Sequence, residues 1–143
     1  AGDIGAGHTV TALYEIALVG EGAEHIPTLR YQDKSTSSEH SINEIAMIKL
    51  RYKQPGNTDS VELGKVVKKQ ELRDSINNSS DDLRFAASVA GFGQLLQGGK
   101  YTTGWGYNDA LALARNSRGK DLHGYRSEFV HLIELAQSLS SAI

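Results

Sequence analysis

The 143-residue sequence contains no cysteine, which excludes disulfide frameworks, thiolate metal sites and cysteine nucleophiles. It also lacks a basic excess, because 15 Lys and Arg stand against 17 Asp and Glu. A duplex-binding surface usually needs that excess, so we expect no nucleic-acid partner. No apolar run approaches the roughly 18 residues of a transmembrane helix, so no membrane span is expected. The chain starts at Ala1 without a methionine, and we expect it to be a C-terminal fragment of a longer protein.

The first half of the sequence predicts β-structure. Apolar side chains alternate along residues 9–19 and 44–53, and a third apolar segment follows at 61–67, which indicates three strands, the second with one face buried. The second and third are separated by QPGNTDS at 54–60, a turn sequence that favours antiparallel pairing. Gly64 is a candidate β-bulge. Three short strands leave unpaired edges, so we expect strands upstream of this chain to complete the sheet.

The second half predicts helices. Ser79 and Asp82 have capping-box spacing and open an apolar-periodic helix that ends at Gly98-Gly99. This helix has a flank of small residues against which another backbone could pack closely. Two more helices are predicted near residues 108–117 and 124–140, the last with an apolar stripe made of Tyr125, Phe129, Leu132, Ile133, Ala136 and Leu139.

Strands followed by helices indicate the α+β class. We expect a small antiparallel β-sheet from the N-terminal half packed with about three C-terminal helices. The length fits a single domain, residues 1–143, made of a β-rich part at 1–70 and a helical part at 78–143.

The search for catalytic, cofactor and metal sites gives weak candidates. The glycines within residues 2–7 precede a strand, whereas a dinucleotide-binding loop follows one. His8 has no second catalytic group at a useful spacing, so a small hydrolase using His8 is the least favoured function. The sequence from Asp33 to Ser37 fits the Asp-x-Ser-x-Ser pattern of metal-dependent adhesion sites, but no apolar strand precedes it. We therefore predict no catalytic, cofactor-binding or metal-binding residues and no enzyme activity.

Two surface features indicate binding. The turn YTTGWGY at 101–107 carries Tyr101, Trp105 and Tyr107, aromatic residues of the kind that interfaces favour. They are a candidate partner-binding site, and the alternative is a buried plug between helices. The strand regions also carry a local basic strip that suits either a solvated face or an acidic partner, made of Arg51, Lys53, Lys65, Lys68 and Lys69.

Six segments resemble, in order, the C-terminal region of bacterial von Willebrand factor type A domain proteins. They are IGAGHTVTALYEI (4–16), LRY (29–31), IKLRYK (48–53), LRFAASVAGFGQLL (83–96), ALALAR (110–115) and DLHGYRSEFVHLIELAQSL (121–139).

The resemblance implies a domain of unknown function that follows an adhesion domain, which carries the real metal site. It implies an exported protein of the bacterial cell envelope, in the periplasm or at the surface, with a lipoprotein anchor upstream in some members. It supplies no catalytic residues. We expect a non-enzymatic accessory module that supports or docks to the upstream von Willebrand factor type A domain of the same chain. The alternative is an adaptor that binds another protein through the aromatic turn.

Overall fold

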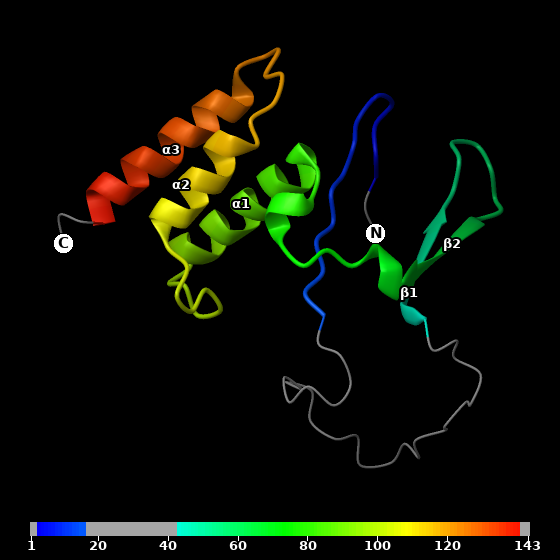
Figure 1. Ribbon diagram of the computed structural model, residues 1–143. Helices are drawn as coiled ribbons and strands as arrows, with labels where there is room; N and C mark the ends of the chain where they lie inside the picture. The colour runs from blue at the N-terminus through cyan, green and yellow to red at the C-terminus, as the bar shows by residue number, and fades with distance from the viewer. Residues whose placement is uncertain (1–2, 17–42, 141–143) are drawn as a thin grey trace. The chain divides into compact units, whose positions relative to one another are not determined.

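A computed structural model describes residues 3–16 and 43–140 (Figure 1). Its contacts divide the chain into two compact units, one formed by Ala1–Tyr14 with Arg73–Ile143 and the other by Glu15–Leu72. The second unit holds a two-stranded sheet and the first holds three α-helices. The predicted α+β class is therefore confirmed, with strands preceding helices along the chain.

The second unit is a β-hairpin. Strand β1 (Glu44–Tyr52) pairs antiparallel with β2 (Val61–Lys68), as the sequence predicts. The turn that joins them includes a hydrogen bond from the Asn57 N–H to the Gln54 carbonyl, 3.1 Å long. A short 3₁₀ helix, η1 (Lys69–Glu71), follows β2 directly.

Gly64 is not a bulge. It lies directly opposite Lys49 in the ladder, and the irregular pairing lies between Glu44 and Ala46 instead. A β-carbon added at residue 64 would come within 3.0 Å of the Met47 methyl carbon. The glycine therefore leaves room for a neighbouring side chain and does not interrupt the register.

The apolar face of the hairpin is exposed, whereas the sequence predicts a buried face. Ile48, Leu50 and Leu63 share this face and expose 51%, 57% and 53% of their surface. Alternation in a sequence determines which side chains lie on the same face of a strand. It does not determine whether another layer covers that face.

The first predicted strand forms no ladder. Residues 9–16 belong to no sheet among the described residues, while 17–19 lie outside them, so the prediction of a strand across 9–16 is wrong. Alternating β-branched residues favour strand structure, but a sheet also needs a neighbour at about 4.8 Å. No other described segment supplies that neighbour.

The helices of the first unit begin close to the predicted positions. They are α1 (Asp81–Leu96), α2 (Tyr107–Asn116) and α3 (Tyr125–Ser140), and a 3₁₀ helix, η2 (Ile76–Asn78), precedes them. The N-cap of α1 is Ser80 and not Ser79, because the Ser80 hydroxyl accepts a hydrogen bond from the Leu83 N–H.

The end of α1 has a Schellman motif. Gly98 has a φ of +98°, its N–H donates to the Leu95 carbonyl, and the Gly99 N–H donates to the Gln94 carbonyl. A left-handed residue at this position satisfies the last carbonyls of a helix and favours glycine. The predicted end at Gly98-Gly99 is confirmed.

The core of the first unit lies between the three helices. It consists of Phe92, Ala110, Leu111, Ala114, Val130 and Ile133. Phe129 packs edge-on against both Phe85 and Phe92, with ring centroids 5.3 and 5.5 Å away. This edge-to-face geometry is favourable for aromatic rings and joins α3 to α1.

Candidate interaction surfaces

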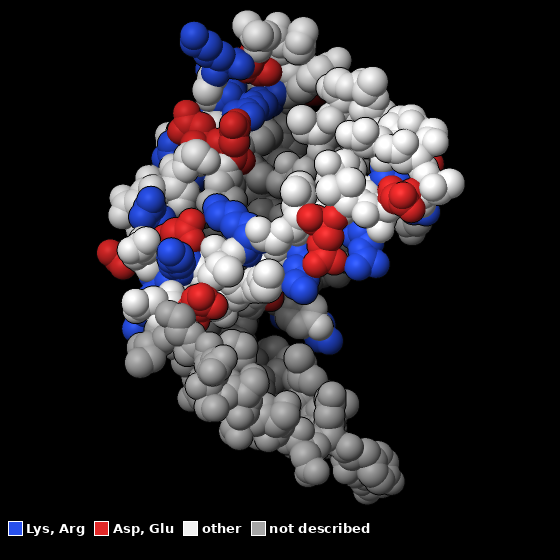
Figure 2. All heavy atoms as spheres, turned by 90° about the vertical axis from the view of Figure 1, so that its right-hand side faces the viewer, with Lys and Arg blue, Asp and Glu red and all other residues white. Residues whose placement is uncertain are grey.

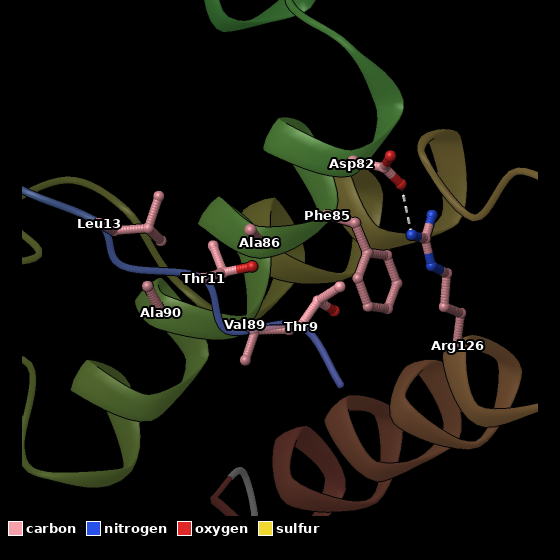
Figure 3. A pocket seen from close by; sticks show the side chains of 9 residues that line it. All are labelled: Thr9, Thr11, Leu13, Asp82, Phe85, Ala86, Val89, Ala90 and Arg126. Carbon is pink, nitrogen blue, oxygen red and sulfur yellow. Dashed lines mark hydrogen bonds and ion pairs between the residues drawn. The ribbon is translucent and has the colours of Figure 1, made fainter. Parts of the chain in front are cut away.

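A groove of about 680 Å³ runs along α1 beside the N-terminal chain, and we call it the α1 groove (Figure 3). The N-terminal extended segment, defined as residues 9–14, contributes Thr9, Thr11 and Leu13. The helices contribute Asp82, Phe85, Ala86, Val89, Ala90 and Arg126. Ala86 and Ala90 belong to the small-residue flank of α1, and the N-terminal chain passes beside this flank, where small side chains leave room for another backbone.

Arg126 closes one end of the α1 groove. Its guanidinium forms an ion pair with Asp82 and lies 4.8 Å from the centre of the Phe85 ring. It also donates hydrogen bonds to the carbonyls of Ser117 and Arg118, each 3.3 Å long. These contacts tie the start of α3 to α1 and to the end of α2. Because both terminal nitrogens of its guanidinium already have protein partners, we assign Arg126 a structural role.

The predicted aromatic residues lie in two environments. Tyr101 is 65% exposed, whereas Trp105 and Tyr107 are partly buried against the core. The Trp105 ring lies on α1 at Gly91, where an added β-carbon would come within 2.3 Å of it. Tyr107 packs against Phe92, with ring centroids 6.1 Å apart.

Tyr101 and Trp105 border a shallow, mainly apolar groove of about 320 Å³ beside α1. We call it the aromatic groove. Gly91 and Thr102 also line it, whereas Tyr107 does not. Two of the three predicted binding residues therefore share one surface, and the third packs against the core.

His8 lies at an exposed turn. Its backbone N–H donates to the Gly5 carbonyl at 3.1 Å, and no described side chain forms a hydrogen bond or ion pair with its imidazole. Among residues 3–16 and 43–140, no three His, Asp or Glu side chains converge as a metal site would require. The sequence from Asp33 to Ser37 lies outside the described residues.

The charges of the hairpin do not form a single basic strip. Arg51 pairs with Glu62 at 3.0 Å on one face, whereas Lys65 lies on the other face and pairs with Glu71 at 3.4 Å. The N–H of Lys68 donates to Glu71 and, with Lys65 nearby, lowers the pKa of that carboxyl despite partial desolvation. Figure 2 likewise shows acidic and basic side chains interspersed.

Two carboxyl groups of the helical unit also have lowered pKa values. Desolvation raises the pKa of Asp121, but hydrogen bonds from the Ser127 hydroxyl and from the N–H groups of Ser127 and Arg126 outweigh it and lower the pKa overall. The pKa of Glu134 is lowered by hydrogen bonds from His131 and Arg115. Both carboxylates satisfy local donors at helix surfaces.

The apolar stripe predicted on α3 is only half buried. Phe129, Ile133 and Ala136 pack in or against the core. Tyr125, Leu132 and Leu139 are exposed, so this part of the stripe lies on the surface. Among the described helices, none has the length and hydropathy needed to cross a bilayer.

The α+β module with these surfaces matches a known family over nearly its whole length. The family is described as "Uncharacterized protein YfbK, C-terminal", and its model matches residues 1–139. The chain belongs to this family. A relative, "Uncharacterized protein YfbK" of Escherichia coli (strain K12), is 38% identical over 143 residues, which are 98% of this chain.

The match covers 24% of the length of the E. coli relative, so the chain spans about a quarter of it. Together with the description of the family as C-terminal, this confirms the prediction of a C-terminal domain of a longer protein. No solved structure gives a significant match.

Proposed function

We propose that this domain is a non-enzymatic accessory module that docks onto an upstream von Willebrand factor type A domain of its parent protein. The six resembling segments support the identity of the upstream domain. The E. coli relative supports the presence of a large upstream part, because the chain covers 24% of its length. The same resemblance supports a location in the bacterial cell envelope.

The observation that carries the proposal is the exposed apolar face of the hairpin. Its members come from both strands and are 38% to 57% exposed, namely Ile48, Leu50, Tyr52, Val61 and Leu63. A two-stranded hairpin is at best marginally stable in water without a covering layer. Covering five half-exposed apolar side chains would contribute on the order of 5 kcal/mol. Because the upstream domain is tethered in the same chain, its effective concentration at the hairpin is in the millimolar range. A binding free energy of that size is therefore enough to keep the upstream domain docked on the apolar face.

The test is a calorimetric titration of the 143-residue chain with the separately purified upstream part of its parent, in magnesium and again in chelator. We expect saturable binding that Leu50→Glu weakens at least about tenfold, because a charge would be buried in the interface. The matched control is Lys49→Gln, which changes the neighbouring residue on the opposite face of β1. The control should bind like the unchanged chain.

The titration tests three points, which are whether the two domains bind, whether the apolar face is the interface, and whether binding depends on the metal. A change of affinity on metal removal would link docking to the metal site of the upstream domain. Equal binding by the Leu50 and Lys49 variants would show that the apolar face is not the interface. Absence of binding in both buffers would overturn the docking function.

A second candidate function is an adaptor that binds another protein through the aromatic groove. The exposure of Tyr101 beside the Trp105 ring favours it. Tryptophan fluorescence of the domain tests the accessibility of this surface. Red-shifted emission that iodide quenches would support the adaptor, whereas blue-shifted and protected emission would support the plug.

A further inference from the structure

One face of α3 carries exposed apolar side chains that the packing of the helical unit does not use. In Figure 1, α3 forms one side of the three-helix layer, with α2 between it and α1. Val130 and Ile133 are the buried residues of α3. A different set of residues, which we call the α3 stripe, is 51% to 86% exposed and consists of Leu122 just before the helix and Tyr125, Leu132, Leu135 and Leu139 within it.

The α3 stripe has the spacing of a coiled-coil seam. Tyr125, Leu132 and Leu139 follow one another at intervals of seven residues, and Leu135 comes three residues after Leu132. These are the a and d positions of a heptad, which in a coiled coil pack into a second helix. The shape of this surface therefore suits a helical partner.

The area of the α3 stripe is close to what a dimer needs. At roughly 200 Å² for a fully exposed large residue, its exposed fractions amount to on the order of 600 Å². A standard interface takes about 800 Å² from each partner, so the stripe with its flanking side chains supplies one. Apolar patches of this size on a protein surface usually mark an interaction site.

The α3 stripe is complementary to its own reverse. In an antiparallel pair of helices, each step of about 1.5 Å along one helix is a step back along the other. When Tyr125 lies level with the partner's Leu135, Leu139 comes level with the residues just before the partner's α3, where Leu122 lies. Apolar side chains then meet apolar side chains at both ends of the helix pair.

The same register gives a charge partner to Glu128, the acidic residue within the stripe. Its side chain has no hydrogen bond or ion pair with another described residue. In the antiparallel register it comes level with the partner's Leu132, one residue from the partner's His131. The His131 side chain is 77% exposed and contacts Glu134 through Nδ1 at 3.0 Å, so a protonated His131 can donate from Nε2 to the partner's Glu128.

We propose that two copies of this chain form a two-fold symmetric dimer in which their α3 helices pack antiparallel along the α3 stripe, with Tyr125 beside the partner's Leu135. A two-fold axis repeats every contact, so one surface serves both copies and the Glu128–His131 pair forms twice. This interface goes beyond the proposed function, which concerns the hairpin and the upstream part of the parent.

Sedimentation equilibrium of the 143-residue chain measures this association. We expect a reversible dimer at micromolar concentrations, and Leu132→Glu should raise its dissociation constant at least about tenfold, because the new carboxylate would be buried level with the partner's Glu128. Ala112→Glu is the matched control, since Ala112 is exposed on α2 and outside the α3 stripe. The control and Leu50→Glu in the hairpin should both dimerise like the unchanged chain.

Disulfide trapping reports the register directly, because the chain contains no cysteine of its own. Tyr125→Cys combined with Leu135→Cys should give a covalent dimer on mild oxidation, since the two positions meet across the interface. Within one copy they are ten residues apart on α3, or about 15 Å, which is too far for a disulfide. Identical positions of the two copies are equally far apart, so each single-cysteine variant should stay unlinked.

Three results would overturn the inference. The first is a chain that remains monomeric throughout the micromolar range. The second is an equal dissociation constant for Leu132→Glu and Ala112→Glu, which would place the interface on another surface. The third is linking of a single-cysteine variant as efficiently as the pair, which would exclude the antiparallel register. The titration with the upstream part judges the proposed function separately, because a monomeric chain can still bind that part through its hairpin.

Discussion

The ring of Trp105 lies directly on Gly91 of α1, so that a β-carbon at residue 91 would come within 2.3 Å of ring carbon Cζ3. Only a glycine allows this approach. The contact places the tryptophan of the predicted aromatic turn against a helix and leaves Tyr101 exposed beside it.

Gly91→Ala should destabilise the domain. Overpacking costs about 1–3 kcal/mol, which exceeds the roughly 1 kcal/mol that alanine gains in helix propensity. Gly93→Ala is the control, because nothing lies within 4 Å of the added carbon, and it should be stabilising by up to about 1 kcal/mol. Urea unfolding of both variants measures the difference. An equal gain in both would mean that Trp105 does not pack on Gly91.

Ser88→Ala should cost about 0.5–1.5 kcal/mol of unfolding free energy. The Ser88 side chain is fully buried, and its hydroxyl donates a 2.8 Å hydrogen bond to the Ala110 carbonyl, which links α1 to α2. Ser138→Ala removes only an exposed bond to Leu135 within α3 and should change stability by less than about 0.5 kcal/mol. Chemical denaturation of the two variants would contradict this prediction if their losses were equal.

Phe129→Ala should be among the most damaging single changes, at about 3–5 kcal/mol. The ring contacts Phe85 and Phe92 edge-on, and its removal opens a cavity between α1 and α3. Tyr125→Ala, on the same helix, is a suitable control because Tyr125 is 72% exposed. Thermal or urea unfolding should separate the two clearly. A loss below about 1 kcal/mol for Phe129→Ala would mean that the aromatic cluster is not packed as described.

The stability of the domain should fall at acidic pH. The folded-state pKa of Asp121 lies below its ordinary value of 3.8, since hydrogen bonds from Ser127 and Arg126 outweigh desolvation. The unfolded state therefore binds more protons, and the contribution is present above about pH 4 and lost as pH falls through the folded pKa.

Asp121→Asn should flatten this dependence in urea unfolding measured between about pH 2.5 and 6. Asp59→Asn, which removes a carboxylate without a hydrogen bond or ion pair in the described structure, should leave the slope unchanged. The same slope in both variants would show that the Asp121 contacts do not stabilise the folded state.

The helices and the hairpin were predictable because their signals are local. Apolar residues at helical spacing, the glycines after Leu96 and the Pro55-Gly56 turn depend on residues within a few positions of each other. The N-cap was misplaced by one residue because Ser79 and Ser80 are both good caps, and only the geometry shows that Ser80 reaches the Leu83 N–H.

The interaction surfaces were predicted in part. The aromatic turn was identified from its composition, but the division between exposed Tyr101 and packed Tyr107 depends on contacts with α1 and Phe92. The α1 groove was missed as a site. The only signal for it was the small-residue flank of α1, which does not reveal which backbone passes beside it.

The sequence alone determined the α+β class, the antiparallel hairpin, the positions of the three helices and the membership of a C-terminal domain family. These depend on local periodicity and on similarity over nearly the whole chain. Only the tertiary structure decided that residues 9–16 join no ladder among the described residues, that Ile48 and Leu50 are exposed, and that Gly91 accommodates Trp105. Pairing, burial and close approach depend on residues far apart in the chain, and a pattern within one segment does not contain its partner.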